Sequence, residues 1–345
     1  MLFGIIGSGS WATALAKILT DNRQSIIWWI RHEQVIKHLT TRKHNPNYLS
    51  SVYFDTSYLT LCNEVHQVIE KADTILFAVP SAYIPAILEH LPRGIFKDKK
   101  ILSAVKGILP DRNLLLNEYL QKEFEISDQE YFTVMGPCHA EEVASEKLSY
   151  LTFSGKEMRT TDQISAYFKT EYLNAITNDD VYGVQYAAVL KNIYALGAGI
   201  AHGLEYGDNF LSVLIANSAD EMAGFLKKVG IRHMDVGSHD EEDPVTHKKS
   251  PNYAASVYLG DLLVTCYSLY SRNRMFGNMI GKGYSVKSAQ LEMNMVAEGF
   301  NASKCIYEIN RKVGAEMPIA ETIYRILWEQ IGAQVAFKKM EADLV

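Results

Sequence analysis

The stretch FGIIGSGSWA, residues 3–12, decides how the first half of the chain folds. Its apolar beginning is typical of a buried strand, and the residues that follow it have the apolar spacing of a helix. Between them, Gly7, Gly9 and Ala12 form a G-x-G-x-x-A pattern. In this context the pattern indicates a dinucleotide-binding turn, because Gly7 permits a tight turn, Gly9 admits a pyrophosphate to the backbone and Ala12 allows close helix packing. The competing interpretation is a glycine-rich strand–helix turn without a ligand.

The same alternation of short apolar runs and helical patterns continues through the first half of the chain. Helical spacing occurs, for example, at Trp11–Asp21 and Tyr83–Leu91. Such alternation predicts a doubly wound, mostly parallel sheet, and therefore an α/β Rossmann domain over residues 1–178. The expected strands are Phe3–Gly7, Ser25–Ile30, Tyr58–Cys62, Thr74–Val79, Lys100–Val105 and Tyr131–Met135, with a last pair at Leu148–Ser154 and Tyr172–Thr177.

Long helical patterns dominate the second half, where strand signals nearly vanish. An all-α domain is therefore expected over residues 179–345. A polar, turn-rich segment at residues 230–253 interrupts it and predicts a surface loop. The expected helices are Val181–Ala201, Asn209–Val229, Ala255–Tyr270, Ala289–Lys312 and Ile319–Trp328.

Length and composition agree with two globular domains. The chain has 345 residues, of which 48% are hydrophobic and 21% charged, whereas single cores stop growing near roughly 250–300 residues. A net charge of −6 offers no general attraction to nucleic acid or to an anionic membrane. The N-terminus lacks the basic region of a signal peptide, and no apolar stretch is long enough for a transmembrane helix. We therefore expect a cytoplasmic protein with no nucleic-acid partner and no integral membrane association.

The cysteines and the loop histidines do not indicate a metal. The four cysteines are far apart without a C-x-x-C pair, which favours reduced thiols over a zinc cluster or a disulfide framework. Acidic and histidine side chains gather in the predicted loop, but their spacing matches no standard metal site, so a solvated loop is the preferred interpretation. These residues are His233, Asp235, His239, Asp240, Glu241 and His247.

The end of the second expected strand indicates which dinucleotide is preferred. NAD-selective turns place an acidic residue about 20 residues after the glycines, where it binds the ribose hydroxyl. Here that place holds Arg31 and His32, followed by Glu33. A cation pairs with a 2′-phosphate, so the sequence predicts NADPH preferred over NADH, although Glu33 argues for the opposite. The competing interpretation of Arg31 is a solvated charge at a helix start.

Two further segments follow expected strands and so lie where a doubly wound sheet places its ligand crevice. Lys106 stands beside Gly107 and offers a compact charge for an anionic or carbonyl oxygen, unless it is an ordinary surface lysine. The segment Gly136–Ala140 precedes a helix, so its backbone N–H groups are candidates for cradling an anion.

One lysine interrupts the apolar helix expected at the start of the second half. Lys191 lies among alanines, leucines and other apolar residues. Burial costs a lysine its solvation and lowers its pKa toward neutrality, which suits a group that donates a proton to a developing alkoxide. The competing interpretation is a lysine whose ammonium reaches solvent from a partly exposed face.

Two later segments carry polar groups in apolar or glycine-rich surroundings. Ser271 is expected to be a helix N-cap that directs backbone N–H groups and Arg272 toward an anion such as a phosphate. Glu298 is a single carboxylate in an apolar stretch, where it either accepts a hydrogen bond from a ligand or lies on a helix surface.

Taken together, these segments resemble the bacterial NAD(P)-dependent glycerol-3-phosphate dehydrogenases over nearly the whole chain. Nine patterns that are typical of that family occur here in the same order. They lie at Gly7–Ala14, Ala78–Ser81, Lys106-Gly107, Gly136–Val143, Lys191-Asn192, Gly260–Cys266, Ser271–Arg274, Val296–Gly299 and Met317–Ile319.

The resemblance implies reversible reduction of dihydroxyacetone phosphate to sn-glycerol 3-phosphate for phospholipid synthesis, with Lys191 as general acid/base. It implies contacts between substrate and Lys106, Gly136, Cys138, Lys191, Asp261, Ser271, Arg272 and Asn273. It also implies contacts between cofactor and Gly7, Gly9, Ser10, Trp11, Arg31, His32, Lys106, Ala140, Arg272, Val296 and Glu298. The expected partners are a small phosphorylated molecule and, as a hypothesis, a second copy of the chain.

The sequence departs from the family at Gly207–Ser212, at the enlarged segment 230–253 and at Cys138-His139. Two other functions remain open at this point. One is a reductase of the same plan that acts on a different keto acid or sugar phosphate, against which Ser271–Arg274 argues. The other is a dinucleotide-sensing regulator without turnover, against which the presence of both Lys106 and Lys191 argues.

Overall fold

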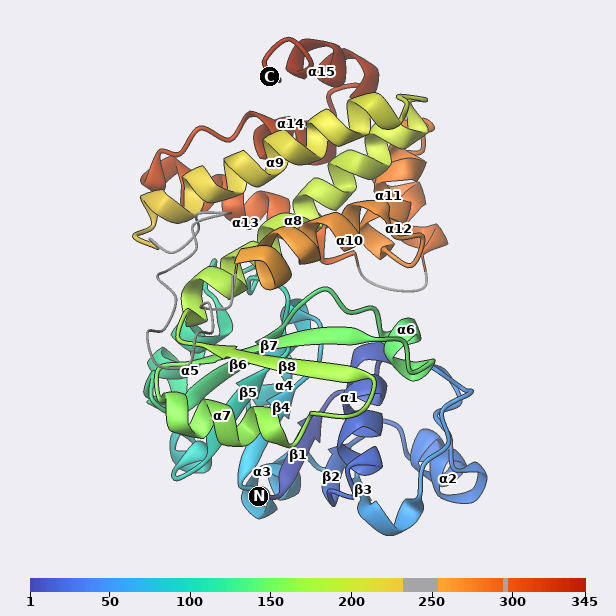
Figure 1. The fold of residues 1–345 in the computed structure, drawn as a ribbon, viewed down its shortest axis with the longest axis vertical. Helices are drawn as coiled ribbons and strands as arrows, with labels where there is room; N and C mark the ends of the chain where they lie inside the picture. The colour runs from blue at the N-terminus through green and yellow to red at the C-terminus, as the bar shows by residue number, and fades with distance from the viewer. Residues whose placement is uncertain (232–253, 294–296) are drawn as a thin grey trace, which may run out of the picture. The chain divides into compact units, whose positions relative to one another are not determined.

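The computed structural model describes residues 1–231, 254–293 and 297–345. By its internal contacts the chain forms two units, Met1–Val181 and Tyr182–Val345, whose helices and strands are labelled in Figure 1. The first unit is built on a sheet and the second on helices.

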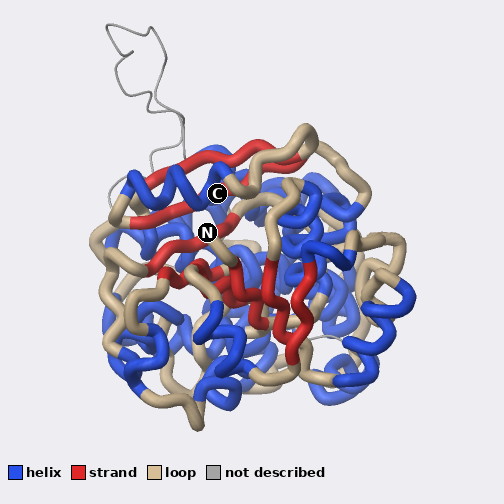
Figure 2. The backbone as a smooth tube through the Cα atoms, turned by 90° about the horizontal axis from the view of Figure 1, so that it is seen from below, coloured by secondary structure: helices blue, strands red, loops and turns tan. Residues whose placement is uncertain are grey.

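The first unit contains an eight-stranded sheet in the order β3-β2-β1-β4-β5-β6-β7-β8. All neighbouring strands are parallel except β6 and β7, which pair antiparallel, and Figure 2 shows the twist of the sheet from strand to strand. The expected doubly wound, mostly parallel sheet is thereby confirmed. Its strands are β1 (Phe3–Ile6), β2 (Ile26–Trp29), β3 (Leu59–Cys62), β4 (Thr74–Phe77), β5 (Lys100–Ser103), β6 (Tyr131–Met135), β7 (Ser149–Gly155) and β8 (Leu173–Asn178).

Both faces of this sheet are buried, because alternate strand residues enter two separate cores. Ile5 and Leu76 pack in one core with residues of α1 and α7, whereas Ile6 and Phe77 pack in the other with residues of α3, α4 and α5. This explains why the strands are continuous apolar runs in the sequence. The helices are α1 (Ser10–Asp21), α2 (Glu33–Arg42), α3 (Val65–Lys71), α4 (Ile84–Leu88), α5 (Leu116–Phe124), α6 (Ala140–Ala144) and α7 (Met158–Ala166).

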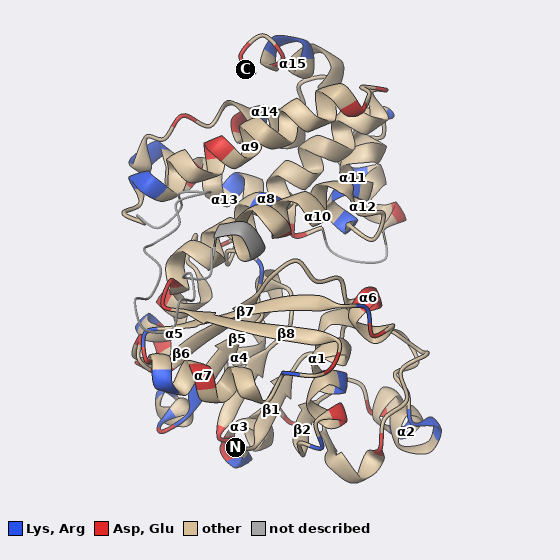
Figure 3. Cartoon of the chain, in the orientation of Figure 1, with Lys and Arg blue, Asp and Glu red and all other residues tan. Residues whose placement is uncertain are grey.

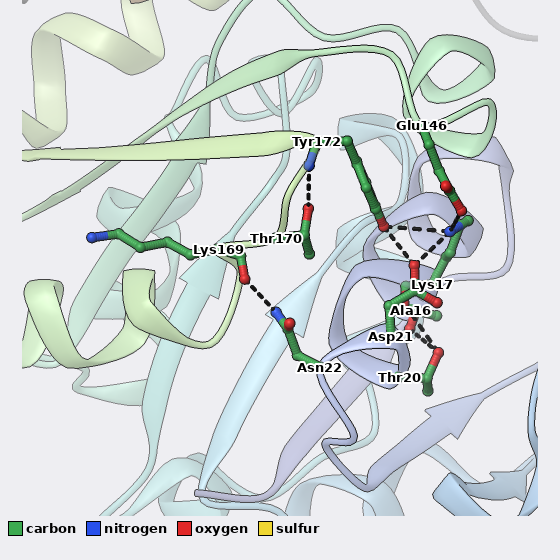
Figure 4. A network of polar contacts seen from close by, with 9 residues as sticks. All are labelled: Ala16, Lys17, Thr20, Asp21, Asn22, Glu146, Lys169, Thr170 and Tyr172. Atoms are coloured by element: carbon green, nitrogen blue, oxygen red, sulfur yellow. Dashed lines mark hydrogen bonds and ion pairs between the residues drawn. The ribbon is translucent and has the colours of Figure 1, made fainter.

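A polar network anchors α1, the helix that follows the glycine-rich turn. Lys17 donates to Asp21 at 2.5 Å and to Glu146 at 2.9 Å, and the Tyr172 hydroxyl donates to Asp21 at 2.6 Å (Figure 4). Burial opposes the charge of Lys17, but the hydrogen bonds to the two carboxylates outweigh it and raise the pKa of Lys17. The network therefore fixes α1 to segments more than 120 residues away in the chain.

The second unit is helical throughout its described residues, as expected for an all-α domain. Its central helix, α8 (Val181–Gly203), is buried along most of its length. The other elements are α9 (Asp208–Lys228), a π-helical segment (Ala254–Gly260), α10 (Asp261–Tyr267), α11 (Arg272–Gly281), α12 (Val286–Glu292), α13 (Glu298–Val313), α14 (Pro318–Trp328) and α15 (Ala333–Met340).

Two glycines let α8 and α11 cross closely. A Cβ added at Gly199 would stand 2.1 Å from the carbonyl oxygen of Arg274, and one added at Gly277 would stand 2.1 Å from that of Leu196. Any side chain at either position would force the helices apart, since real Cβ contacts are never so short. This crossing packs the beginning of α11 against the helix that carries Lys191.

Several helix boundaries differ from those expected. The single helix predicted over Ala289–Lys312 is wrong, because α12 ends at Glu292 and α13 begins only at Glu298. The helix predicted over Ala255–Tyr270 is a π-helical segment followed by α10. The expected N-cap at Ser271 marked the start of α11 but not its end, and α15 was not predicted. The confirmed N-cap explains one of these breaks, since Ser271 accepts a hydrogen bond from the Arg274 amide at 3.3 Å and so begins a new helix. Of the predicted loop, residues 232–253 lie outside the described residues.

Charged side chains of both signs are spread over the described surface, and the cysteines are not joined in disulfides. Figure 3 shows Lys and Arg interspersed with Asp and Glu over the described part of both units. All four cysteines lie among the described residues, and none of them forms a disulfide. Among the helices of the described residues, none combines the length and apolar character needed to cross a bilayer.

Candidate active site

The glycine-rich turn has the backbone that its pattern predicts. Gly7 has a φ of +130°, and a Cβ there would stand 2.3 Å from the carbonyl oxygen of Ala78 at the end of β4. Gly9 is the N-cap of α1, and a Cβ there would meet nothing within 4 Å. The first position therefore requires glycine for the fold, whereas the second leaves open space beside the helix N-terminus. This arrangement fits a dinucleotide pyrophosphate.

Two side chains that sequence reasoning missed hold this turn. The indole N–H of Trp28, on β2, donates to the carbonyl oxygen of Gly7 at 2.6 Å. The fully buried amide of Asn45 donates to the carbonyl oxygen of Ser8 at 3.1 Å and to the Thr13 hydroxyl at 3.0 Å. Neither residue belongs to the glycine pattern, so only the fold connects them with it.

The residues expected to determine the preference for NADPH over NADH follow the end of β2. Arg31 and His32 are exposed, and His32 is the N-cap of α2. Within the described residues Arg31 is in no ion pair. Its guanidinium is therefore available to an external anion such as a ribose phosphate. Ser10, the first residue of α1, and Trp11 are half-buried.

The first unit also brings together residues from three expected motifs. The Lys106 ammonium donates to the carbonyl oxygen of Gly136 at 3.3 Å and lies 5.3 Å from the centre of the Trp11 ring. Cys138 is buried, with its thiol donating to the carbonyl oxygen of Tyr150 at 3.1 Å. Ala140 is the first residue of α6. Lys106, Gly136 and Trp11 thus form a cluster that combines a cation with an aromatic ring.

The second unit holds Lys191 in a buried ion pair. The Lys191 ammonium on α8 contacts the Asp261 carboxylate at the start of α10, and the two residues are only 4% and 1% exposed. The sequence suggested a lysine whose pKa burial lowers, whereas the fold supplies a counter-charge that favours the ammonium form. The pair thus places a buried cation and a buried anion in direct contact.

Thr265, one turn after Asp261, binds the backbone at Asp261 and lies near its carboxylate. Its hydroxyl donates to the Asp261 backbone carbonyl at 2.5 Å and lies 3.5 Å from Oδ1. Sequence reasoning gave Thr265 no role, although its spacing of four residues from Asp261 on one helix was a usable signal. The neighbouring Cys266 thiol is fully buried, and burial raises its pKa to about 12. It therefore remains a thiol at neutral pH.

The Asn273 side chain links three helices of the second unit. Its amide donates to the Asn192 side chain at 2.8 Å, and its oxygen accepts from the Gly299 N–H at 2.9 Å. These two hydrogen bonds join α11 to α8 and to α13. On α8 the bonded residue, Asn192, follows Lys191 directly in the sequence. Sequence reasoning gave Asn192 no role of its own. Arg272 is exposed and Glu298 half-buried; Val296 lies outside the described residues.

The candidate metal ligands of the predicted loop, His233 to His247, also lie outside the described residues. Within residues 1–231, 254–293 and 297–345, no group of three His, Cys, Asp or Glu side chains is arranged to hold a metal ion.

An α/β unit with a dinucleotide turn and a helical unit with a buried lysine–aspartate pair define a two-domain NAD(P)-dependent dehydrogenase. Two family models match the chain: the N-terminus of the NAD-dependent glycerol-3-phosphate dehydrogenases at residues 3–161, and their C-terminus at residues 180–338. The chain belongs to the NAD-dependent glycerol-3-phosphate dehydrogenase family.

Relatives over the full length support this assignment. The chain is 33% identical over 339 residues to a glycerol-3-phosphate dehydrogenase [NAD(P)+] of Bacillus subtilis, with 98% of this chain and 93% of the relative covered. A protein of the same name from Enterococcus faecalis is 31% identical, with 97% and 94% covered. The fold is similar to the crystal structure of glycerol-3-phosphate dehydrogenase from Coxiella burnetii, with a TM-score of 0.86, 25% identity and 98% of both chains covered.

Proposed function

We propose that the protein catalyses the reversible NAD(P)H-dependent reduction of dihydroxyacetone phosphate to sn-glycerol 3-phosphate. The observation that carries this proposal is the buried ion pair between Lys191 and Asp261, in a chain whose full-length relatives bear the name of this reaction. A buried, paired lysine has no packing advantage over an apolar side chain, so a chemical role explains its presence.

The first unit is proposed to bind the cofactor, which supplies a hydride to the substrate carbonyl carbon when bound. The open face of Gly9 admits the pyrophosphate to the N-terminus of α1, where backbone N–H groups and the helix dipole favour a negative charge. Ser10, Trp11, Lys106 and Ala140 are proposed as further contacts. From the second unit, Arg272, Val296 and Glu298 are proposed as contacts.

The second unit is proposed to move the proton. As negative charge develops on the carbonyl oxygen, Lys191 donates a proton from its ammonium and becomes a neutral amine; in the oxidation direction it takes the proton back. Asp261 favours the ammonium before the transfer, because its carboxylate is in direct contact with that ammonium. The resulting alcohol oxygen carries the transferred proton, so atoms and charge balance.

Substrate binding is proposed to use charged and polar side chains together with backbone N–H groups. In the second unit, the N-terminus of α11 offers Ser271, Arg272 and Asn273 for the phosphate, since helix N-termini and Arg bind such anions. In the first unit, Lys106, Gly136 and Cys138 are proposed as contacts. The proposed product is the glycerol phosphate that phospholipid synthesis needs, and we propose that the protein works in the cytoplasm as a homodimer.

The reaction is tested by initial rates of NADPH and NADH oxidation at 340 nm with purified protein and dihydroxyacetone phosphate. We expect rapid oxidation that requires this substrate, with NADPH favoured. Dinucleotide binding without turnover would contradict the proposed reaction and point to a sensor, while turnover with another keto compound alone would point to a different reductase.

Replacing Arg31 with alanine is expected to lower kcat/KM for NADPH by about 5-fold while leaving that for NADH within about 2-fold, because an exposed charge pair is worth up to about 1 kcal/mol. The measurement is the ratio of the two kcat/KM values. Arg42→Ala, which removes the same charge at the other end of α2, is the control and should leave the ratio unchanged. Equal losses with both cofactors would contradict the proposed 2′-phosphate contact.

A further inference from the structure

The first and last carbonyl groups of the glycine-rich turn point toward buried donors. The carbonyl oxygen of Gly7 accepts a hydrogen bond from the Trp28 indole at 2.6 Å. The carbonyl oxygen of Gly9 accepts from the backbone N–H and from the hydroxyl of Thr13, each at 2.9 Å. Trp28 on β2 and Thr13 on α1 are both 0% exposed, so neither side chain can touch a ligand that approaches from solvent.

Asn45, which follows α2, holds the carbonyl group between these two. Its amide nitrogen donates to the carbonyl oxygen of Ser8 at 3.1 Å and to the Thr13 hydroxyl at 3.0 Å. Its amide oxygen accepts from the backbone N–H groups of Asn47 at 3.0 Å and Tyr48 at 3.3 Å. These bonds use both donors and both lone pairs of the side-chain amide. Asn45 is also 0% exposed, so its orientation is fixed and it cannot contact a cofactor itself.

The three carbonyl groups determine where the N–H groups that follow them point. In a trans peptide the N–H is directed opposite to the C=O, and the described residues contain no cis peptide bond. Because the carbonyl groups of residues 7–9 face buried donors, the N–H groups of Ser8, Gly9 and Ser10 are directed away from those donors. Within the described part of the chain, none of these three N–H groups donates a hydrogen bond. Successive N–H groups of this kind form anion-binding concavities in proteins.

We propose that Trp28, Asn45 and Thr13 are positioning residues: they fix the peptide groups of the turn so that the N–H groups of residues 8–10 are directed at the cofactor pyrophosphate before it binds. This inference rests on the proposed binding of the dinucleotide at this turn. The glycine pattern provides the space for the pyrophosphate, but glycine also has the widest conformational freedom. Peptide groups that had to be ordered during binding would cost affinity, so buried donors that fix them beforehand strengthen binding.

The decisive comparison is between Asn45→Asp and Asn45→Ala. Aspartate has nearly the same shape and still accepts from Asn47 and Tyr48, but it has no N–H to donate to Ser8 or Thr13. We expect both variants to raise the Kd for NADPH about 10-fold or more, because a misdirected hydrogen bond to a charged group costs roughly that factor. The fluorescence of bound NADPH measures this Kd without any turnover. Normal affinity in Asn45→Asp would confine the role of Asn45 to the turn at residues 45–48 and overturn the inference.

Thr13→Val tests the same hydrogen bonds without adding a charge. Valine keeps the volume of threonine and removes the hydroxyl that links Asn45 to the Gly9 carbonyl, while the backbone hydrogen bond to that carbonyl remains. We therefore expect a smaller rise in the Kd for NADPH, about 3-fold. Since both side chains act on one set of peptide groups, the double variant with Asn45→Ala should lose little more affinity than Asn45→Ala alone. Fully additive losses would contradict a shared role.

Asn22 provides the matched control for a loss of stability. At the other end of α1, its amide donates to the carbonyl oxygens of Tyr167 and Lys169, each at 2.9 Å. Asn22→Ala therefore also removes two hydrogen bonds that tie α1 to a distant segment. It should keep the Kd for NADPH within about 2-fold of the wild type, because it leaves the turn untouched. An equal loss of affinity in Asn22→Ala and Asn45→Ala would reduce the effect to the general stability of α1.

Hydrogen exchange at residues 8–10 separates the direction of the N–H groups from affinity. With NADPH concentrations that saturate each protein, we expect exchange there to slow about 10-fold in the wild type but at most about 2-fold in Asn45→Ala. Equal protection in the two proteins would overturn the inference. No protection in the wild type would overturn both the inference and the proposed cofactor site, whereas a failure to turn over dihydroxyacetone phosphate would contradict only the proposed reaction.

Discussion

Replacing Lys191 with alanine is expected to lower kcat for reduction of dihydroxyacetone phosphate by about 100-fold or more, because general acid catalysis contributes roughly 10²–10⁴-fold. The ammonium of Lys191 is paired with the Asp261 carboxylate inside the core. Its removal leaves the developing alkoxide without a proton donor, while the dinucleotide turn in the first unit is untouched. Single-turnover and steady-state oxidation of NADPH measure the effect, and near-wild-type kcat would exclude Lys191 as the acid.

Folding must be controlled in this experiment, since the variant leaves Asp261 buried without its counter-charge. Breaking a buried pair in this way costs about 3–5 kcal/mol of stability. The double variant Lys191→Met, Asp261→Asn removes both charges and should recover much of that stability while remaining inactive. Lys227→Ala, at the exposed end of α9, serves as the control for a lost lysine and should keep full activity. Recovery of turnover in the double variant would contradict the proposed mechanism.

Replacing each of the two glycines of the dinucleotide turn with alanine is expected to affect different properties, stability at Gly7 and cofactor binding at Gly9. Gly7→Ala should lower the free energy of unfolding by about 3 kcal/mol or more, because the residue has a φ of +130° and its Cβ would stand 2.3 Å from the Ala78 carbonyl oxygen. Gly9→Ala should change stability by less than about 1 kcal/mol, because its backbone is extended and its Cβ would meet no atom within 4 Å. Urea unfolding followed by circular dichroism separates the two variants.

The affinity for the cofactor should fall in Gly9→Ala, the variant whose stability changes little. In Gly9→Ala, a methyl group occupies the space through which the pyrophosphate reaches the backbone, so we expect the Kd for NADPH to rise at least about 10-fold in a protein that still folds normally. Gly94→Ala, at another position where a Cβ meets nothing within 4 Å, is the control and should bind NADPH normally. Unchanged NADPH binding by Gly9→Ala would place the dinucleotide elsewhere.

The sheet and its ligand turn could be predicted from sequence because both depend on local patterns. Apolar runs of strand length alternate with helical spacing, and a φ of +130° at Gly7 is a conformation that glycine alone adopts easily. The helix boundaries of the second unit were predicted less well. There the periodic pattern continues past Glu292, where α12 ends, whereas the helix start at Ser271 was recognisable because serine is a common N-cap.

Within the candidate site, sequence alone identified the groups but not their partners. Lys191 was recognisable because a charged residue is rare in an apolar helix. Gly7 and Gly9 were recognisable because the turn requires glycine, at Gly7 for its backbone conformation and at Gly9 for the space beside the helix N-terminus. The tertiary structure decided that Asp261, 70 residues away, neutralises Lys191 and that Asn45 holds the glycine turn. A buried charge requires some partner, but which distant residue supplies it depends on how the helices pack, and no local pattern records that.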